Sequence, residues 1–573
     1  MSPFLISILI LLPLDSPERS YEICPGLRLQ NKASLDLSKN ERELLCGDPN
    51  VNAWKSIPRN QRKLFVSRFL QQRGYQSPKY SNEPDNILTL IPGEKSRITS
   101  ILITGIPTNL LRLHKRRNLI GAILTPKKLD ELSSWIRSEL QNQGYGCPHI
   151  DIKASPLGEI RVQIDSGPIH LLTEIERPSS DIYNFQILQR YEAFHIGEPI
   201  DNRLLTLSSL RVLKDDFFLS AYYDLRCSPS QSLRIRQQTI LGKPRLITIG
   251  VGIDTEGLLK GQIRWKNLGL GKNANTLKAE LDASFVQQSA EISADWFPLE
   301  ASSRFHLLPR LKGTRFSEEK YEAISAEISA FASTNHDFSH FNLQASYGPS
   351  YEFVDTQKGN GPTNARFISF KGQLRLMSHS FEYYLSKPET GWDVIFNSYS
   401  RFQKLYSSST FHRFSIDSIV LWNLGDFSPP YAVFGWRTSL GTFWFPNDGF
   451  QLSLPPQLRF FLGGDADVRG FSRKEIPNNG VGFRSFVYNG FELRTGDFFP
   501  YGIQPLIFLD MAWGGDGFFR LNGPTYSSPG AGIRWNTKIG VFRGTAAHGF
   551  IWGPQIKNVD SHWQFFLSYG QEF

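Results

Sequence analysis

The chain has 573 residues, of which 20% are charged and 40% hydrophobic, and its formal net charge is +9. This composition excludes a disordered chain, and the length predicts roughly four units of about 150 residues each. The longest apolar run, from Phe4 to Leu14, is about half of the roughly 20 residues that a membrane-spanning helix needs, so we expect no transmembrane helix. The positive charge is typical of a solvated surface, although it would also suit an anionic membrane.

Aromatic residues are abundant, with 43 Phe, 20 Tyr and 12 Trp against only 3 Met. A helical soluble protein does not need this ratio. Antiparallel β structure often has many aromatic residues, because aromatic side chains fit a pleated sheet and form the girdles of membrane barrels. The composition therefore favours a β-rich protein.

Two features bear on the compartment of the protein. Residues 1–20 predict a signal peptide, since residues 4–12 are apolar, although no Lys or Arg precedes them and no Ala-x-Ala site follows. A short apolar N-terminus that stays attached is the alternative. Cys24 and Cys46 are close enough in the sequence to pair in an oxidising compartment, and buried free thiols are the alternative. Cys147 and Cys227 complete the four cysteines and show no metal-binding spacing.

Up to about residue 245 the sequence alternates helix and strand patterns. Thr125-Pro126 predicts a helix start, with Thr as the N-cap and Pro in the first turn. Apolar residues then recur at spacings of three and four and mark one helix face, namely Leu129, Leu132, Ile136 and Leu140. Gly144-Tyr145 ends this helix, and the alternation in residues 159–165 predicts a strand.

The same pattern occurs upstream, displaced by 70 residues. Gly74-Tyr75 parallels Gly144-Tyr145, and residues 86–93 parallel residues 159–167. A third and weaker copy has Asp216-Phe217 where Gly-Tyr is expected. We therefore expect three small β-α-α-β-β repeats, at residues 21–97, 98–169 and 170–245.

From residue 246 onward, short alternating runs are separated by Gly, Pro, Asn and Asp. These 328 residues would supply about 20 per strand for a 16-stranded barrel, enough for about ten membrane residues plus turns. In the last run the apolar residues share one face: Trp563, Phe565, Leu567, Tyr569 and Phe573. A transmembrane barrel with an apolar exterior and a polar lumen produces this pattern, and a soluble sandwich is the alternative. The predicted fold class is α+β repeats followed by an all-β antiparallel barrel at residues 246–573.

Enzyme signatures are missing from the sequence. There is no Gly-x-Ser-x-Gly elbow and no His-Glu-x-x-His zinc helix. Residues 269–272 lack the leading Gly of a phosphate loop, and no Ser or Thr follows Lys272. Asp465, Asp467 and Asp516 are not part of a calcium loop with its terminal Glu. We therefore expect no catalytic residues, no metal site and no cofactor.

The most distinctive segment is residues 461–471, with the sequence Phe-Leu-Gly-Gly-Asp-Ala-Asp-Val-Arg-Gly-Phe. Its paired glycines permit a tight turn, so a tip that carries Arg469 could insert into a polar lumen. Arg469 would then need acidic partners, because an unpaired guanidinium in a confined site is costly. Glu492 and Asp510 are the candidates, since each interrupts an apolar, strand-like run. An ordinary surface turn beside two lumen carboxylates is the alternative.

Val468-Arg469-Gly470-Phe471 resembles the VRGF/Y motif in the sixth extracellular loop of the Omp85 superfamily of outer-membrane barrels. The resemblance implies that Arg469 folds back into the barrel and contacts acidic residues on the inner wall. Glu492 and Asp510 stand at the positions of the superfamily's E and F-x-D elements, the latter within Phe508-Leu-Asp510.

The three repeats resemble POTRA domains. Pro388–Gly391 is similar to the P-x-x-G motif in the barrel of the assembly-factor branch. Phe573 resembles the aromatic C-terminal residue of the β-signal, the last strand of outer-membrane barrels. A protein with three repeats is most similar to the TamA-like branch. Two-partner transporters of the FhaC/ShlB type usually carry two POTRA domains and a plug helix, and BamA usually carries five POTRA domains. Asp216-Phe217 and Gln571 depart from the superfamily pattern.

The resemblance implies an outer-membrane protein of a bacterium or a bacterium-derived organelle, with its repeats in the periplasm. The repeats would capture unfolded outer-membrane or autotransporter-like client proteins. The barrel would insert or translocate them at the seam between residues 246–253 and 563–573. Outer-membrane lipid and an inner-membrane or periplasmic protein are further expected partners, and nucleic acid is not. The alternatives are a two-partner secretion pore for a dedicated exoprotein and a soluble β-rich binding protein.

Overall fold

The computed structural model describes residues 21–569, except for residues 31–34, 48–56, 83–86, 107–118, 177–181, 228–231, 385–388, 408–409, 447–453, 497–498, 538–539 and 554–561. The expected signal peptide at residues 1–20, Pro388 and Phe573 lie outside the described residues. The chain forms two compact units. One comprises Met1–Gln141 with Cys147–Pro168, and the other comprises Asn142–Gly146 with Ile169–Phe573.

The first unit begins with a four-stranded sheet in the order β1-β2-β4-β3 and two helices. Its elements are β1 (Tyr21–Cys24), β2 (Leu27–Leu29), α1 (Lys39–Cys46), α3 (Arg59–Gln71), β3 (Lys79–Asn82) and β4 (Leu88–Ile91). A capping box starts α1, in which the Ser38 side chain accepts from the Glu41 N–H and the Glu41 carboxylate accepts from the Ser38 N–H. A disulfide joins Cys24 to Cys46 and so ties β1 to α1. No described cysteine is a free thiol.

The second repeat is a three-stranded sheet in the order β5-β7-β6, with β5 parallel and β6 antiparallel to β7. Its elements are β5 (Ser100–Thr104), α4 (Pro126–Gln141), β6 (His149–Ala154) and β7 (Glu159–Asp165). The predicted apolar face of α4 is buried at Leu132, Ile136 and Leu140. β7 alternates buried apolar and exposed polar residues, so one face of the sheet forms the core and the other meets water.

The second unit begins with a third sheet, in the order β8-β10-β9. Its elements are β8 (Leu171–Glu176), α5 (Ile182–Leu188), the one-turn helix η6 (Gln189–Tyr191), α6 (Asn202–Lys214), β9 (Phe218–Arg226) and β10 (Ser232–Leu241). Two or three residues after the main helix of each repeat, one residue has a left-handed φ: 94° at Gly74, 97° at Gly144 and 65° at Asp216. Asp216 thus takes the position that glycine holds in the other two repeats, and Asp tolerates this conformation better than most residues.

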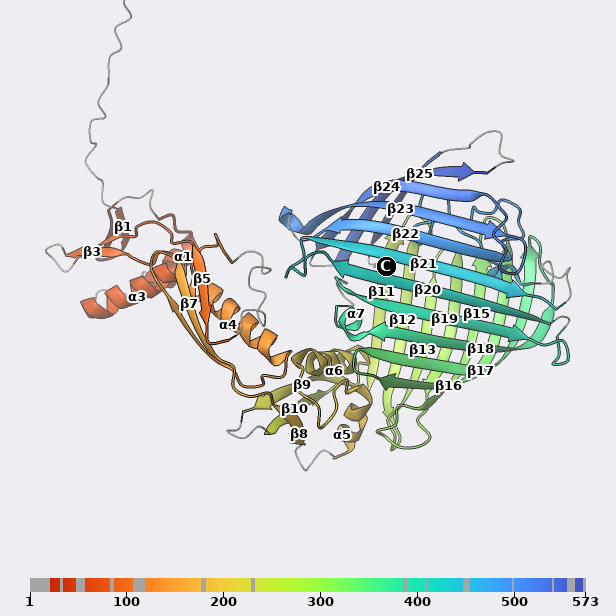
Figure 1. The fold of residues 1–573 in the computed structure, drawn as a ribbon, viewed down its shortest axis with the longest axis horizontal. Helices are drawn as coiled ribbons and strands as arrows, with labels where there is room; N and C mark the ends of the chain where they lie inside the picture. The colour runs from red at the N-terminus through yellow and green to blue at the C-terminus, as the bar shows by residue number, and fades with distance from the viewer. Residues whose placement is uncertain are drawn as a thin grey trace, which may run out of the picture. The chain divides into compact units, whose positions relative to one another are not determined.

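Sixteen antiparallel strands then form a closed barrel (Figure 1). They are β11 (Arg245–Asp254), β12 (Leu258–Leu270), β13 (Asn275–Ala283), β14 (Gln287–Asp295), β15 (His306–Ser317), β16 (Glu322–Asp337), β17 (Phe341–Lys358), β18 (Ala365–Ser378), β19 (Gly391–Arg401), β20 (Phe411–Asn423), β21 (Ala432–Trp444), β22 (Ser485–Thr495), β23 (Ile503–Gly515), β24 (Thr525–Thr537), β25 (Gly540–Trp552) and β26 (His562–Tyr569). The predicted fold class is confirmed, and a sandwich is excluded.

Short helices also occur within this β region, where the sequence pattern predicts none. They are α7 (His379–Tyr383), η8 (Pro456–Leu458) and η9 (Pro500–Gly502). Ser378 caps α7 by accepting a hydrogen bond from the Phe381 N–H. At one to two turns, these helices are too short to show an amphipathic period.

The barrel exterior is apolar, and much of its inner wall is polar. On β11 the outward row is Ile247, Ile249, Val251 and Ile253, with 66–75% of each side chain exposed. Inward residues of neighbouring strands form ion pairs, such as Arg264 with Glu280 at 3.0 Å and Arg375 with Asp393 at 2.8 Å. Such exposed apolar rows are unfavourable in water, and this alternation is typical of a barrel in a membrane.

None of the described helices is long and apolar enough to cross a membrane.

We predict that the detergent-extracted protein migrates faster on a gel before boiling than after it. A closed barrel of hydrogen-bonded strands resists detergent and stays compact until it is heated. Fractionation of inner and outer membranes, followed by paired unboiled and boiled samples, measures this. Identical bands in the soluble fraction would contradict a membrane barrel.

Candidate functional site

The distinctive sequence segment lies in the connection between β21 and β22. Because successive strands alternate in direction, this connection lies at the barrel end opposite to the start of β11 and to the third repeat. It is the sixth connection at that end, the place that the resemblance predicts for the motif. Residues 454–484, which the structure describes, are here called the inner loop.

The tip of the inner loop turns back at two glycines. Gly463 and Gly464 have φ values of 108° and 120°, a region that favours glycine. A Cβ atom on Gly463 would lie 2.3 Å from the carbonyl oxygen of Ser472. The N–H groups of Gly463 and Val468 donate to the Asp467 carboxylate. These contacts fix the backbone that leads to Arg469.

Arg469 is completely buried and forms ion pairs with the two carboxylates that the sequence suggested. Its Nε and Nη2 donate to the two oxygens of Asp510 at 2.8 and 2.9 Å. Its Nη1 donates to Glu492 at 2.8 Å, and its backbone N–H donates to Asp510 at 3.2 Å. The guanidinium also lies over the ring of Phe508, 3.4 Å from the centroid. This bidentate, stacked geometry is specific to arginine.

Two further residues support this ion pair, and the sequence did not single them out. The Tyr488 hydroxyl donates to Asp510 at 3.1 Å. The Arg543 guanidinium lies 3.7 Å from Glu492. Tyr488 precedes Glu492 by four residues and so shares the inner face of β22. That period of two could have identified Tyr488, but nothing in the sequence links Arg543 to this site.

The other motif residues pack the loop against the inner wall. Gly470 lies so close to β25 that an added Cβ atom would be 2.5 Å from the Cα of Gly549. The Phe471 ring meets Tyr526 and His562 edge to face, with centroids 5.7 and 5.6 Å apart. Val468 is fully buried in the same apolar cluster as Phe471.

That cluster fills part of the lumen with apolar side chains. From the inner loop it takes Leu454, Phe460, Leu462, Val468, Phe471, Ile476 and Phe483. From the inner wall it takes Val354, Phe367, Tyr399, Phe411, Phe443, Phe486, Tyr488, Ala512 and Tyr526. Burial of so many large side chains holds the loop in place, because each contributes about 1.5–3 kcal/mol relative to exposure.

The inner loop also bridges the two sides of the barrel closure. The Glu256 carboxylate, in the turn after β11, accepts a hydrogen bond from the Asp465 N–H at 2.8 Å. Arg473 and Lys474 pair with Glu318, in the turn after β15, at 3.0 and 2.8 Å. On β26, the other side of the closure, His562 lies 3.5 Å from Glu475 of the loop.

The closure itself has few strand pairs within the described part of the chain. Among the described residues, β11 and β26 share one pair in register, Asp254 with Ser568. Thr255 and Leu567 add two hydrogen bonds: the Thr255 N–H donates to the Leu567 carbonyl at 3.0 Å, and the Leu567 N–H donates to the Thr255 hydroxyl at 3.2 Å. β11 is paired with β12 along its whole length, from Arg245 to Asp254. We call the contact between β11 and β26 the seam.

The expected β-signal residues lie on β26, apart from Phe573. Trp563, Phe565 and Leu567 share the outer face and have 60–68% of their side chains exposed. The Tyr569 ring packs against Phe542 with centroids 4.7 Å apart. A cavity of 580 Å³ is lined by Tyr569, by Gly250–Gly252 of β11 and by Lys260 and Gln262 of β12.

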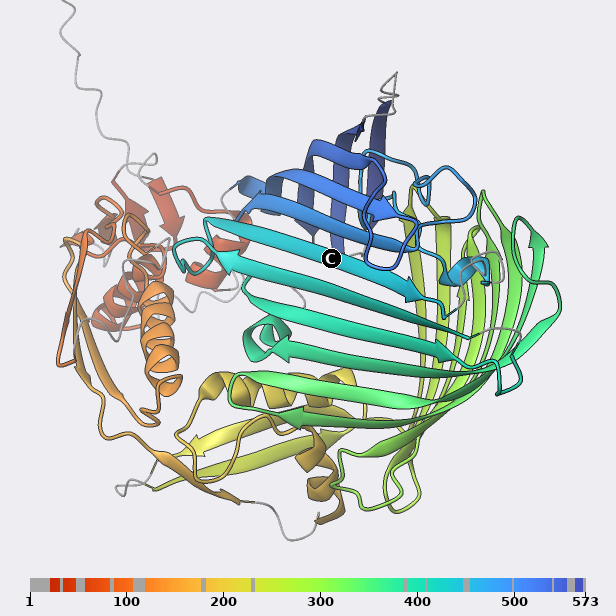
Figure 2. The ribbon, with the colours of Figure 1, turned by 45° about the vertical axis from the view of Figure 1, so that its right-hand side comes forward.

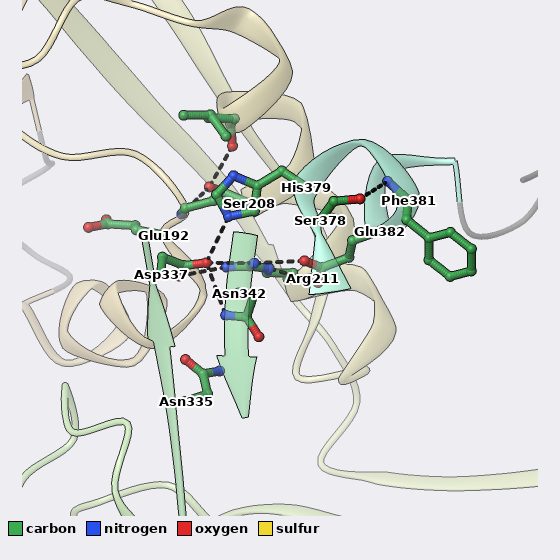
Figure 3. Close-up of polar contacts among 12 residues, drawn as sticks. Glu192, Ser208, Arg211, Asn335, Asp337, Asn342, Ser378, His379, Phe381 and Glu382 are labelled. Atoms are coloured by element: carbon green, nitrogen blue, oxygen red, sulfur yellow. Dashed lines mark hydrogen bonds and ion pairs between the residues drawn. The ribbon is translucent and has the colours of Figure 1, made fainter. Parts of the chain in front are cut away.

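A second buried charge cluster, which the sequence did not suggest, joins the third repeat to the barrel (Figure 3). Arg211 of α6 donates to Asp337 at the end of β16 and to Glu382 of α7, at 2.7–2.9 Å. Arg304 and His379 also contact Asp337, at 2.6 and 3.2 Å. Burial by itself would lower the pKa of Arg211, but the hydrogen bonds to Glu382 and Asp337 raise it above its ordinary value.

Other contacts complete the junction between the third repeat and the barrel. Arg190 donates to the Ala301 carbonyl and stacks on Phe297, 3.5 Å from the ring centroid. Asp216 pairs with Lys266 of β12 at 2.6 Å. Figure 2 shows α6 (olive) and α7 (teal) beside each other at this end of the barrel. The third repeat is therefore part of the same body as the barrel.

No group of three or more His, Cys, Asp or Glu side chains in the described part of the chain could hold a metal ion.

We predict that Arg469→Ala detaches the inner loop from the inner wall without unfolding the barrel. The substitution leaves Asp510 and Glu492 buried without their main partner, which costs about 3–5 kcal/mol, whereas the strand ladders are unchanged. Protease cleavage within residues 454–484 should increase in membrane extracts, at an unchanged yield of the fast unboiled band. Arg315→Ala, at an exposed position of β15, is the matched control. Equal cleavage in both variants would show that Arg469 does not hold the loop.

We predict that Asp337→Asn loosens the third repeat from the barrel. Arg211 and Arg304 lose the charge that they share, while the side chain keeps its shape. Hydrogen exchange of the α6 amides should accelerate, and exchange in β22 and β23 should not change. Asp224→Asn, which removes a surface pair with Arg226, is the control and should have little effect. Unchanged α6 protection in Asp337→Asn would refute the role of this cluster.

No protein-family model matches the sequence. Among solved structures, BamA from Haemophilus ducreyi lacking POTRA domains 1–3 matches with a TM-score of 0.50 and 14% identity, over 82% of this chain and 99% of that one. CdiB from Escherichia coli matches with a TM-score of 0.46 and 12% identity, over 93% and 99% of the two chains. CdiB from Acinetobacter baumannii matches with a TM-score of 0.44 and 15% identity, over 90% of this chain and 98% of that one. The chain thus has the fold of the BamA structure, a closed barrel preceded by small α/β repeats.

Proposed function

We propose that the protein is an outer-membrane assembly or translocation factor of the Omp85 superfamily, of the TamA-like branch. Its barrel would span the outer membrane, and its three repeats would lie in the periplasm. The BamA-like fold, the apolar exterior of the barrel and the buried Arg469 in the sixth connection support the proposal. The number of repeats supports the branch.

The seam is the observation that carries this function. Among the described residues, β11 meets β26 at one pair, and no described residue of β26 pairs with residues 245–253. Unpaired N–H and C=O groups on a strand edge recruit another strand. Inside a membrane such groups must find partners, since no water is present to bind them. A client hairpin that pairs with β11 would satisfy this edge and enter the membrane beside the barrel.

The repeats would deliver the client in an extended form. Each has a small sheet with outer strands, such as β6 in the second repeat and β9 in the third. An extended chain can add to such an edge through main-chain hydrogen bonds, which gives affinity with little sequence specificity. Unfolded β-rich outer-membrane or autotransporter-like proteins are the clients that this mode suits.

A two-partner secretion pore is the second candidate, and it differs in the route of the client. An exoprotein would pass through the lumen, whereas an assembly client would leave through the seam. The apolar packing of the inner loop against the inner wall supports the seam, because this packing occupies the lumen at rest. Low conductance of the reconstituted protein would agree with the seam route, and a large resting conductance would favour the pore.

We predict that a disulfide across the seam stops client insertion. Asp254→Cys with Ser568→Cys joins the one paired position, and its control is Asp282→Cys with Ser289→Cys, which joins the same residue types between β13 and β14. Each variant is reconstituted into vesicles and given a urea-unfolded small outer-membrane barrel protein. The folded client band is then measured in oxidised and reduced samples.

The oxidised seam variant should fall to the level of protein-free vesicles and recover on reduction. The oxidised control should insert the client normally, because the ladder between β13 and β14 is continuous. Full insertion by a quantitatively cross-linked seam variant would refute the seam route. Loss of insertion in both variants would show that rigidity of the whole barrel, not the seam, is what matters.

A further inference from the structure

The hairpin of β9 and β10 exposes three large apolar side chains at the end that is joined to the barrel. Leu219, Ile240 and Leu241 have 64%, 55% and 50% of their surface exposed. They are neighbours across the ladder, which pairs Ile240 with Ser220 and Leu241 with Phe218. The inner side of the same sheet is an ordinary core, with Phe218 and Ala221 buried. Three adjacent apolar residues in water are unfavourable and indicate a partner.

The chain continues from these residues directly into the barrel. Residues 242–244 join β10 to β11, and Figure 1 shows β9 and β10 beside this end of the barrel. The Gly242 N–H donates to the Phe217 carbonyl, and the Pro244 carbonyl accepts from the Leu268 N–H, at 2.9 and 2.8 Å. The linker is therefore fixed at both ends. Ile247, the first residue of the apolar outer row of β11, follows Leu241 by six residues, at most about 20 Å along the chain.

Two basic residues lie between the exposed hairpin end and that outer row. Lys243 and Arg245 are both exposed, and neither side chain has an ionic partner in the described part of the chain. The nearby carboxylate of Asp216 is already paired with Lys266. The order of residues along the chain is thus apolar, basic and apolar. Such a sequence suits the boundary of a bilayer, where long basic side chains reach phosphate groups and their neighbours enter the acyl region.

We propose that Leu219, Ile240, Leu241, Lys243 and Arg245, here called the hairpin patch, bind the surface of the membrane leaflet that faces the repeats. The three apolar side chains enter the headgroup boundary, and the two basic side chains bind anionic phospholipid phosphates. The patch continues the lipid-facing row of β11, and its charge is complementary to an anionic leaflet. The inference rests on the proposed membrane barrel and adds a lipid site on the third repeat.

Lipid binding at this position would act on the strand that forms the seam. β10 runs into β11 through three residues, and the third repeat is tied to the barrel by Arg211, Asp337 and Glu382. The patch would therefore fix the third repeat at the membrane surface next to β11. A client strand that leaves β9 or its neighbours would then meet the seam at the depth of the headgroups.

The test measures the depth of single spin labels in the full chain. One cysteine is introduced at Ile240, Leu241, Ile247 or Leu171, labelled, and reconstituted into vesicles of phosphatidylethanolamine and phosphatidylglycerol. Relaxation by oxygen reports the lipid phase, and relaxation by a water-soluble nickel chelate reports the aqueous phase. Leu171 is the matched control, because it is exposed and apolar but pairs with Ser232 at the other end of the sheet.

We expect labels at positions 240 and 241 to be relaxed mainly by oxygen, as at position 247, and the label at 171 mainly by the nickel chelate. Lys243→Gln with Arg245→Gln should make the label at 241 shallower in these vesicles and leave it unchanged in pure phosphatidylcholine.

An aqueous label at 241 beside a lipid-exposed label at 247 would overturn the lipid site and leave the barrel intact. An aqueous label at 247 would overturn the proposed function itself. A label at 241 that stays aqueous in vesicles and becomes immobile in detergent as the protein concentration rises would identify a second copy as the partner, and would also overturn the lipid site.

Discussion

The buried ion pair between Arg469 and the carboxylates of Asp510 and Glu492 is the interaction on which the barrel interior depends. A guanidinium is costly to take out of water, so the loop that carries it enters the lumen only because two strands present acceptors there. The ring of Phe508 and the hydroxyl of Tyr488 complete the site. Around it, Val468 and Phe471 bury apolar surface that a loop in water would leave exposed. Charge pairing thus sets the position of the loop, and apolar packing makes the position stable.

The same physical solution occurs at the other end of the barrel. There Arg211 and Arg304 converge on Asp337 and join the third repeat to the barrel turns. At the seam, one pair among the described residues joins β11 to β26. The structure therefore has a buried charge cluster near each end of the barrel and, within the described residues, few pairs at the seam. The hairpin patch is located where the third repeat meets the first strand of the seam.

Features with a local or periodic signal could be predicted from the sequence. The face of α4, the alternation of β7 and the aromatic row of β26 all have a period that identifies a helix or a strand. The partners of Arg469 could be proposed because Glu492 and Asp510 each interrupt an apolar run. Arg211 and Asp337 gave no such signal, since they are 126 residues apart and each resembles a surface charge. Contacts of that kind depend on the tertiary fold, which no local pattern encodes.

The short linker between β10 and β11 has a mechanical consequence. Residues 242–244 are held at both ends by main-chain hydrogen bonds, so a force on the third repeat would pass through them into β11. Such a force would act along β11. Within the described residues β11 has fewer pairs with β26 than with β12, so the strands would separate first at the seam. Asp254 lies at the end of β11 that is farthest from the linker. Its pair with Ser568 would therefore separate after the rest of this edge. The barrel would then yield in one direction, from the side of the repeats outward.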